Sequence, residues 1–330
     1  MAEAINLNDM ECISSEGILH KYKRKSDNKI FTVKILIVSK YTEPEYHPVI
    51  LNLEIISKFT NSCLPLYYGF ATKKVEDHKE VYIFLEESEG SLADYLQRHE
   101  LTKEQITTLI QDTIDVLMFV DKTANILPSY ITPYNIIVTR DSRGELGFKL
   151  FGTLYIDSNG AVKEEDYKWM SPELYEKAKT SNFHQETSAE KSVFYSLGIL
   201  AIFCATKELL TEGRSEIEIE KFGLQNEEKE TEMISYARAK LLAETEDSKL
   251  DEVLGKLLTY SEKERPDFKI WQLKYRSLLG RTGSDQNDSK SNDWFNDSTF
   301  LVRELDTRPM EASIAGCGRK KDGCVGCNIF

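Results

Sequence analysis

The apolar residues of this 330-residue chain change their spacing near Leu92, and this change limits the folds that the chain can adopt. Before that point, short apolar runs such as Ile30–Val38 and Val81–Leu85 alternate with turn-like segments, which is typical of β-strands. Lys25–Asn28 is a polar turn between two such runs and predicts a hairpin. After Leu92 the apolar residues recur at helical spacing. The pattern therefore predicts an α+β fold with a β-rich first part and a mainly helical second part.

Helices are expected where apolar residues recur every three or four positions. One is expected inside the β-rich part and three in the helical part, at Glu43–Phe59, Ile106–Val120, Val193–Ala205 and Ile234–Leu242, with a further amphipathic stretch at Leu250–Leu258. After about Leu279 the composition shifts to Ser, Asp, Asn, Gly and Thr, which bury too little apolar area to offset the entropy of ordering. We therefore expect one folded domain over residues 1–279 and a flexible tail over 280–330.

Composition excludes several classes of function. Forty-two Lys and Arg residues against 55 Asp and Glu residues give a formal net charge of −13, which argues against a nucleic-acid partner because phosphate binding needs clustered cations. We expect neither a signal peptide nor a membrane-spanning run of about 18 apolar residues. Cys12, Cys63 and Cys204 are isolated, which favours reduced core thiols and a cytosolic protein.

Six segments follow one another in the order of the protein kinase motifs. Phe31–Leu36 resembles the V-A-I-K strand, Asn125–Val138 the catalytic loop, and Phe148–Leu154 the strand that enters D-F-G. Three later segments resemble A-P-E, D-V-x-S-L-G and E-R-P-x-F, and they are Trp169–Glu173, Val193–Gly198 and Glu262–Phe268. Over roughly residues 8–278 the chain is therefore similar to the eukaryotic protein kinase-like superfamily. The resemblance implies a two-lobed fold, with an N-lobe at about 8–87 and a C-lobe at about 88–279.

The positions that carry chemistry in this family depart from its pattern. Tyr130 stands where the catalytic-loop aspartate accepts the substrate proton, and Gly152 stands where the D-F-G aspartate holds the metal. Asn52 occupies the place of the glutamate that pairs with the V-A-I-K lysine, so Glu54 is expected to be a solvated surface charge. Thr132, in the same loop as Tyr130, also departs from the family pattern. The resemblance therefore implies a pseudokinase without catalytic residues, acting as a signalling scaffold or allosteric partner of other signalling proteins.

A vestigial nucleotide pocket is expected. Its members by the resemblance are Lys34, Gly17, Leu85, Glu86, Ser88 and Asn135. Cys12 and Ser14 replace two glycines of the phosphate-binding loop, and Thr32 is bulkier than the alanine that covers adenine in the family. No cofactor is expected to be required, and ATP is expected to bind weakly, without magnesium, or not at all. Two alternatives stay open, an active serine/threonine kinase with unconventional residues and a metal-independent ATP-binding switch.

The residues that hold the kinase fold together are retained. Glu173 and Arg265 are expected to form a buried bidentate ion pair, a geometry that suits the planar guanidinium. Val193 replaces the aspartate that braces the catalytic loop, so we expect that bracing to be lost.

The last four residues, Cys327–Phe330, resemble a C-a-a-X prenylation box. Arg319–Lys321 is a basic segment close to it, and Cys324 and Cys317 are candidates for palmitoylation. Asn328 departs from the aliphatic pattern, and a zinc-binding cysteine cluster or a chance match are the alternatives. We expect a peripheral protein of a cytosol-facing membrane, attached through Cys327.

Overall fold

A computed structural model describes the elements that form the two lobes. The described residues are 5–15, 17–41, 50, 54, 62–124, 127–151, 164–180, 187–207, 227–245 and 247–278. The chain divides into two units, residues 1–281 and 282–330, and the second unit lies outside the described residues. The expectations of a flexible tail and of lipidated cysteines therefore fall on residues that the structure does not describe.

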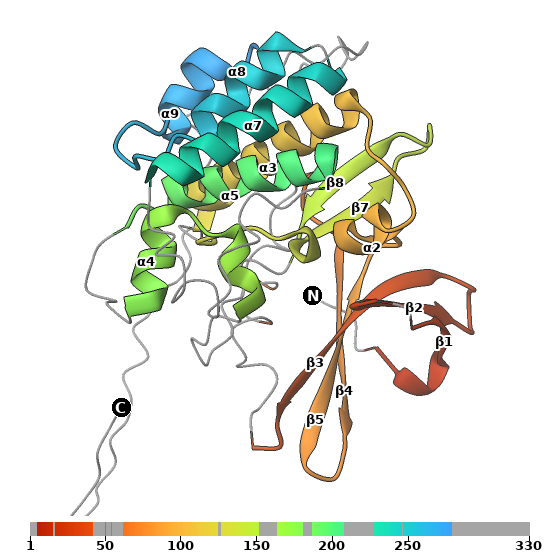
Figure 1. The fold of residues 1–330 in the computed structure, drawn as a ribbon. Coiled ribbons are helices and arrows are strands. Elements are labelled where there is room, and N and C mark those ends of the chain that lie inside the picture. Colours follow the sequence, from red (N-terminus) through yellow and green to blue (C-terminus); the bar gives the residue numbers. More distant parts are fainter. Residues whose placement is uncertain are drawn as a thin grey trace, which may run out of the picture. The chain divides into compact units, whose positions relative to one another are not determined.

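The N-lobe is a five-stranded antiparallel sheet in the order β1-β2-β3-β5-β4 (Figure 1). A 3-10 turn, η1 (Leu7–Asp9), precedes it, and its strands are β1 (Met10–Ser14), β2 (Leu19–Arg24), β3 (Ile30–Ser39), β4 (Tyr67–Lys74) and β5 (His78–Leu85). The predicted hairpin is present between β2 and β3, where Asn28 has a φ of 62°, a left-handed conformation that asparagine tolerates better than most residues.

Each face of this sheet carries its own apolar cluster. One cluster joins Leu19, Ile83 and Leu85 to Ile137 and Phe151 of the C-lobe, so it also connects the lobes. The other cluster is rich in aromatic rings and lies on the opposite face, with Phe31, Tyr82 and Phe84 buried within it. Ile50 is fully buried in the first cluster. Ile50 and Glu54 both have helical backbone. The rest of the helix expected at 43–59 lies outside the described residues.

The C-lobe begins at the end of β5 with small elements that carry the loops of the candidate site. They are β6 (Gly90–Ser91), α2 (Leu92–Leu96), α3 (Lys103–Ala124), η3 (Pro133–Asn135), β7 (Ile136–Arg140) and β8 (Leu146–Leu150). Ser91 caps α2, because its hydroxyl accepts a hydrogen bond from the Asp94 amide at 3.1 Å. The expected apolar face of α3 is buried from Ile106 to Val120, and α3 packs against β8.

The remaining described helices form the body of the C-lobe. They are η4 (Glu164–Trp169), α4 (Pro172–Thr180), α5 (Ala189–Thr206), α7 (Glu227–Thr245), α8 (Ser248–Leu257), α9 (Phe268–Ile270) and the π-helical turn η6 (Trp271–Tyr275). In Figure 1, α5 lies beside α3, α7 and α8, which it contacts. Gly198 permits this packing, since a Cβ there would lie 2.7 Å from the Leu258 side chain.

The central helix of this lobe bears on the expectation about membrane spans. By length and composition α5 is apolar enough to cross a membrane, and 72% of this stretch is buried inside the fold. Burial of that kind is typical of a core helix. Among the free cysteines, Cys63 and Cys204 are buried as expected. Cys12 is exposed on β1, an edge strand, so the expectation of a core thiol is wrong there.

Candidate functional site

Tyr130, in the loop between α3 and η3, is tied to the segment that precedes α4. Its hydroxyl donates a hydrogen bond to Asp166 Oδ2 at 3.0 Å, and Asp166 belongs to η4. Burial raises the pKa of Tyr130, and the negative charge and hydrogen bond of Asp166 raise it further. The hydroxyl is therefore protonated near neutral pH and acts as a donor, which is the opposite of what a general base must do.

The same loop is braced from α5, although the aspartate expected for this purpose is absent. Ser196 Oγ accepts a hydrogen bond from the Ile131 amide at 2.7 Å and donates one to the Ile131 carbonyl at 2.8 Å. Val193 is fully buried. The expectation that bracing is lost is therefore wrong, because a hydroxyl three residues further along α5 satisfies both backbone groups. Ser196 matched its family motif in the sequence, but that match gave no sign of this role.

Asn135 shapes the loop with its side-chain oxygen. Asn135 Oδ1 accepts hydrogen bonds from Thr132 N at 2.9 Å and from Thr132 Oγ1 at 2.7 Å. A carbonyl oxygen has two lone pairs, so both are used here and this oxygen is poorly placed to bind magnesium. Within the described residues, no group of three or more His, Cys, Asp or Glu side chains is arranged to hold a metal ion. Gly152, the D-F-G counterpart, lies outside those residues.

A buried hydrogen bond involves Thr32, the residue that the sequence analysis expects beside adenine. Thr32 Oγ1 on β3 lies 2.8 Å from Ser88 Oγ in the segment after β5, and the two residues are 1% and 5% exposed. Ser88 Oγ also accepts a hydrogen bond from the Gly90 amide at 3.2 Å. The two hydroxyl side chains therefore fill space between the lobes and satisfy each other without a ligand.

The segment that joins the lobes is also held by side chains that the motifs do not include. Glu86 Oε1 accepts hydrogen bonds from Leu66 N at 2.8 Å and from Lys149 Nζ at 2.7 Å. The Glu86 amide in turn donates to the Leu66 carbonyl at 3.0 Å. The side chain of Leu85 is fully buried in the cluster that connects the lobes. Glu86 and Leu85 are thus parts of the hinge structure, and the Glu86 amide is already engaged.

Lys34 and Gly17 lie where the resemblance puts them, on the strand and the hairpin over the cleft. Lys34 is half-buried on β3, opposite Leu19 of β2 and Ile83 of β5. Gly17 has a φ of 72°, and a Cβ there would lie 2.5 Å from the Asp94 carboxylate oxygens. The hairpin tip therefore rests on α2. The positive φ favours a glycine here, because another residue would be strained and would displace the Asp94 carboxylate.

The helix of the N-lobe is described only at single positions. Asn52 lies outside the described residues. Glu54 is half-buried, and its negative charge adds to the effect of burial in raising the pKa of Tyr67. Glu54 is therefore less exposed than the sequence analysis expects, because it lies on the same helix face as the buried Ile50, four residues earlier.

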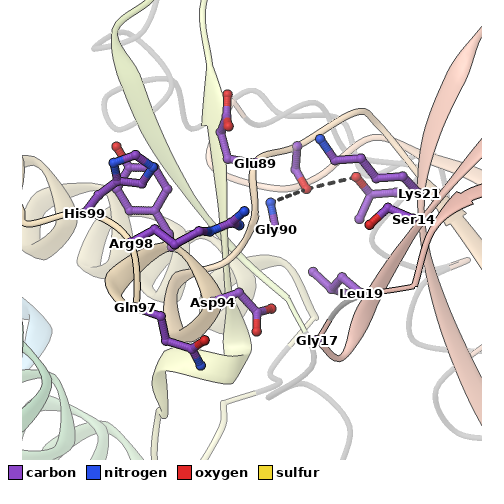
Figure 2. A pocket seen from close by; sticks show the side chains of 13 residues that line it. Ser14, Gly17, Leu19, Lys21, Glu89, Gly90, Asp94, Gln97, Arg98 and His99 are labelled. Atoms are coloured by element: carbon purple, nitrogen blue, oxygen red, sulfur yellow. Dashed lines mark hydrogen bonds between the residues drawn. The ribbon is translucent and has the colours of Figure 1, made fainter.

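A cavity of about 330 Å³ remains beside the Thr32–Ser88 hydrogen bond (Figure 2). Its walls are β1 to β3 of the N-lobe on one side and the segment from Ser88 through α2 to His99 on the other. Figure 2 shows Lys21 and Arg98 reaching into the space between these walls, whereas Glu89 points away from it. The imidazole ring of His99 lies against the Tyr95 ring, with centroids 4.5 Å apart.

Glu173 and Arg265 form the bidentate ion pair that the sequence predicts. Arg265 Nη1 lies 2.8 Å from Glu173 Oε1, and Arg265 Nη2 lies 3.0 Å from Oε2. The guanidinium also donates hydrogen bonds to the carbonyls of Thr259, Tyr260 and Lys191. Burial alone would raise the pKa of Glu173, but the hydrogen bond and charge of Arg265 outweigh it, so this pKa lies below its ordinary value.

Comparison with family models agrees with this arrangement of lobes. The model described as protein kinase domain matches residues 15–275. A search of curated proteins gave no match.

Proposed function

Because the chain belongs to the protein kinase domain family, we propose that it is a catalytically inactive member that acts as a scaffold or allosteric signalling partner. The observation that carries this proposal is the hydrogen bond from the Tyr130 hydroxyl to Asp166. A hydrogen-bond donor, the Tyr130 hydroxyl, therefore stands at the position of the family's catalytic base. General-base assistance contributes roughly 10²–10⁴ in rate, and the glycine at position 152 offers no carboxylate for a metal.

The nucleotide site supports the same proposal. Thr32 and Ser88 fill space that adenine would need, and Asn135 Oδ1 is already bonded twice. We propose that ATP binds weakly or not at all and that magnesium does not assist it. The alternative of a metal-independent ATP-binding switch is also an inactive protein. It differs in that Lys34 and the hinge would still bind a nucleotide.

One observation favours an active kinase as a second candidate. The Asp166 carboxylate lies within hydrogen-bonding distance of Tyr130, so it is the carboxylate closest to the vacated base position among the contacts described above. An active enzyme with unconventional residues would use Asp166 as its base. Asp166→Asn is therefore the variant that separates the two candidates.

Phosphate transfer from radiolabelled ATP tests the proposal. We expect none from the parent to itself or to a panel of protein substrates, with Lys34→Ala as the matched negative control. Tyr130→Asp alone should not restore transfer, because Gly152 still leaves the metal without its ligand. If the parent transfers phosphate and both Lys34→Ala and Asp166→Asn abolish the transfer, the proposal of an inactive protein is wrong and the chain is an active kinase.

Thermal unfolding with ATP tests the nucleotide site. We expect a small shift that is the same with magnesium and with a chelator. Strong stabilisation by magnesium-ATP alone would contradict the proposal. Thr32→Ala removes the hydroxyl and methyl that cover the adenine position, so it should increase stabilisation by ATP if the Thr32–Ser88 contact excludes the base.

We further propose that a prenyl group on Cys327 attaches the protein to a cytosol-facing membrane. A lipid chain contributes about 0.8 kcal/mol per buried CH₂, but a single chain often gives only reversible attachment. The basic segment Arg319–Lys321 adds about 1 kcal/mol for each charge near an anionic leaflet. Acylation of Cys324 or Cys317 would supply a second anchor.

A fluorescent N-terminal tag makes this proposal testable in cells. The parent should lie at membranes, and Cys327→Ser should be diffuse. Cys324→Ser with Cys317→Ser should give an intermediate distribution if these cysteines are acylated. An identical distribution of the parent and Cys327→Ser would exclude the prenyl anchor.

A further inference from the structure

The cavity between the β1–β2 hairpin and α2 holds two cations that the fold itself does not use. Lys21 Nζ and the Arg98 guanidinium make no ion pair and no side-chain hydrogen bond within the described part of the chain. They come from different lobes, and Figure 2 shows the two side chains extending from opposite walls toward the middle of the cavity. Arg98 is exposed and Lys21 is half-buried, so both cations are accessible to an anionic ligand.

The carboxylates that line this cavity do not neutralise these cations. Glu89 is paired with Arg140 at 2.9 Å and points away from the cavity. Asp94 Oδ2 accepts a hydrogen bond from the Ser91 hydroxyl at 2.6 Å, and the carboxylate lies against Gly17 at the hairpin end. The cavity therefore has a cation on each of its two walls and a carboxylate, Asp94, that accepts hydrogen bonds.

We propose that this cavity binds a small phosphorylated polyol. A phosphate monoester carries a charge of about −1.5 to −2 at neutral pH and so matches Lys21 and Arg98 together. Hydroxyl groups of the same molecule would donate to Asp94, with Gln97 and Ser14 as further polar contacts. The volume of about 330 Å³ is at the lower end of the range for small-molecule sites, so one such molecule fits.

This cavity shares Gly17 and Ser88 with the expected nucleotide pocket, and it differs from that pocket in the ligand that it would recognise. The Thr32–Ser88 hydrogen bond closes the adenine side, and neither Lys21 nor Arg98 belongs to the family motifs described above. The proposal goes beyond the inactive-kinase function and does not depend on it, because binding is measured without nucleotide or magnesium. A phosphorylated polyol is available either as a free metabolite or as a lipid headgroup.

Calorimetric titration of the full chain with myo-inositol 1,4,5-trisphosphate, in chelator, tests the site. All variants carry Cys327→Ser, so that a lipid anchor plays no part. Lys21→Met and Arg98→Met should each weaken binding by about tenfold or more, because charge-assisted hydrogen bonds are lost. Lys23→Met removes the same charge from the same strand outside the cavity and should bind like the parent. Equal binding by all four proteins, or no binding of the trisphosphate, would overturn the site.

Three further arms establish the ligand chemistry. Inorganic phosphate and myo-inositol should each bind at least tenfold more weakly than the trisphosphate, and equal binding of inorganic phosphate would overturn the polyol. Tighter binding of AMP than of the trisphosphate would assign the cavity to a nucleotide instead.

Flotation with vesicles of phosphatidylcholine, with or without phosphatidylinositol 4,5-bisphosphate, then distinguishes a lipid headgroup from a free metabolite as the source of the ligand. Capture that depends on this lipid and on Lys21 supports the headgroup, whereas binding of the soluble trisphosphate alone supports a free metabolite.

Discussion

The ion pair of Glu173 and Arg265 and the loop around Tyr130 are both buried polar regions of the C-lobe, and they differ in what the chain has retained. The ion pair keeps the residues of the family motif and five hydrogen bonds to its guanidinium. In the loop, neutral residues stand where the family has charged ones, and Tyr130 hydrogen-bonds to Asp166 whereas Thr132 hydrogen-bonds to Asn135. A buried charge without its partner destabilises the fold, whereas the fold does not depend in the same way on a catalytic carboxylate.

The largest effect is expected where a buried charge loses its partner. Arg265→Ala should lower the free energy of unfolding by about 3–5 kcal/mol, because Glu173 and three carbonyls lose their donor. Arg276→Ala is a matched control, since Arg276 is 34% exposed and pairs with Asp115 at 3.2 Å. It should cost less than about 1 kcal/mol. Urea denaturation measures both, and similar losses would remove the distinction between the two pairs.

The same pair predicts how stability depends on acid. Because the pKa of Glu173 is lowered in the folded state, the pair contributes stability above the ordinary carboxyl pKa of 4.5 and loses it as the pH falls through the folded value. The parent should therefore be more stable than Glu173→Gln at pH 7, and the gap should narrow below pH 4.5. A gap that stayed constant between pH 7 and pH 3 would contradict this electrostatic account.

A smaller loss is expected from the brace of the loop. Ser196→Ala leaves the amide and the carbonyl of Ile131 buried without partners, which should cost about 2–3 kcal/mol. Ser196→Thr keeps the hydroxyl and is the conservative comparison, although its extra methyl must fit a fully buried site. Thermal unfolding of the two variants checks the role of the hydroxyl. If Ser196→Ala melted like the parent, the loop would not depend on α5.

The smallest effect is expected at Tyr130, where one partly buried hydrogen bond joins the loop to η4. Tyr130→Phe removes only the hydroxyl and should cost about 0.5–1.5 kcal/mol. Hydrogen exchange of residues 164–169 should increase in this variant, because the variant loses a hydrogen bond between η4 and the loop. Unchanged exchange there would mean that the Tyr130–Asp166 contact does not position the segment.

Much of the fold follows from patterns that are local in the sequence. The β2–β3 hairpin, the apolar face of α3 and the central helix α5 were all predicted, because strand alternation, turn residues and helical spacing act over a few residues. The Glu173–Arg265 pair was predicted across 92 residues because both members belong to recognisable motifs. These are the features for which the residue types alone carry the information.

Only the tertiary structure decided how the replaced positions are filled. The hydrogen-bond partners of Tyr130, Ile131 and Thr32 lie 36, 65 and 56 residues away in the chain. The residue type of a polar side chain does not indicate which distant group it will bond to in the fold. The expectation of an unbraced loop was wrong for this reason. The sequence shows that Val193 replaces the bracing aspartate, but it does not show that Ser196 hydrogen-bonds to the backbone of Ile131. The two unpaired cations of the cavity were likewise hidden, because Lys21 and Arg98 belong to different lobes and line one cavity only in the folded domain.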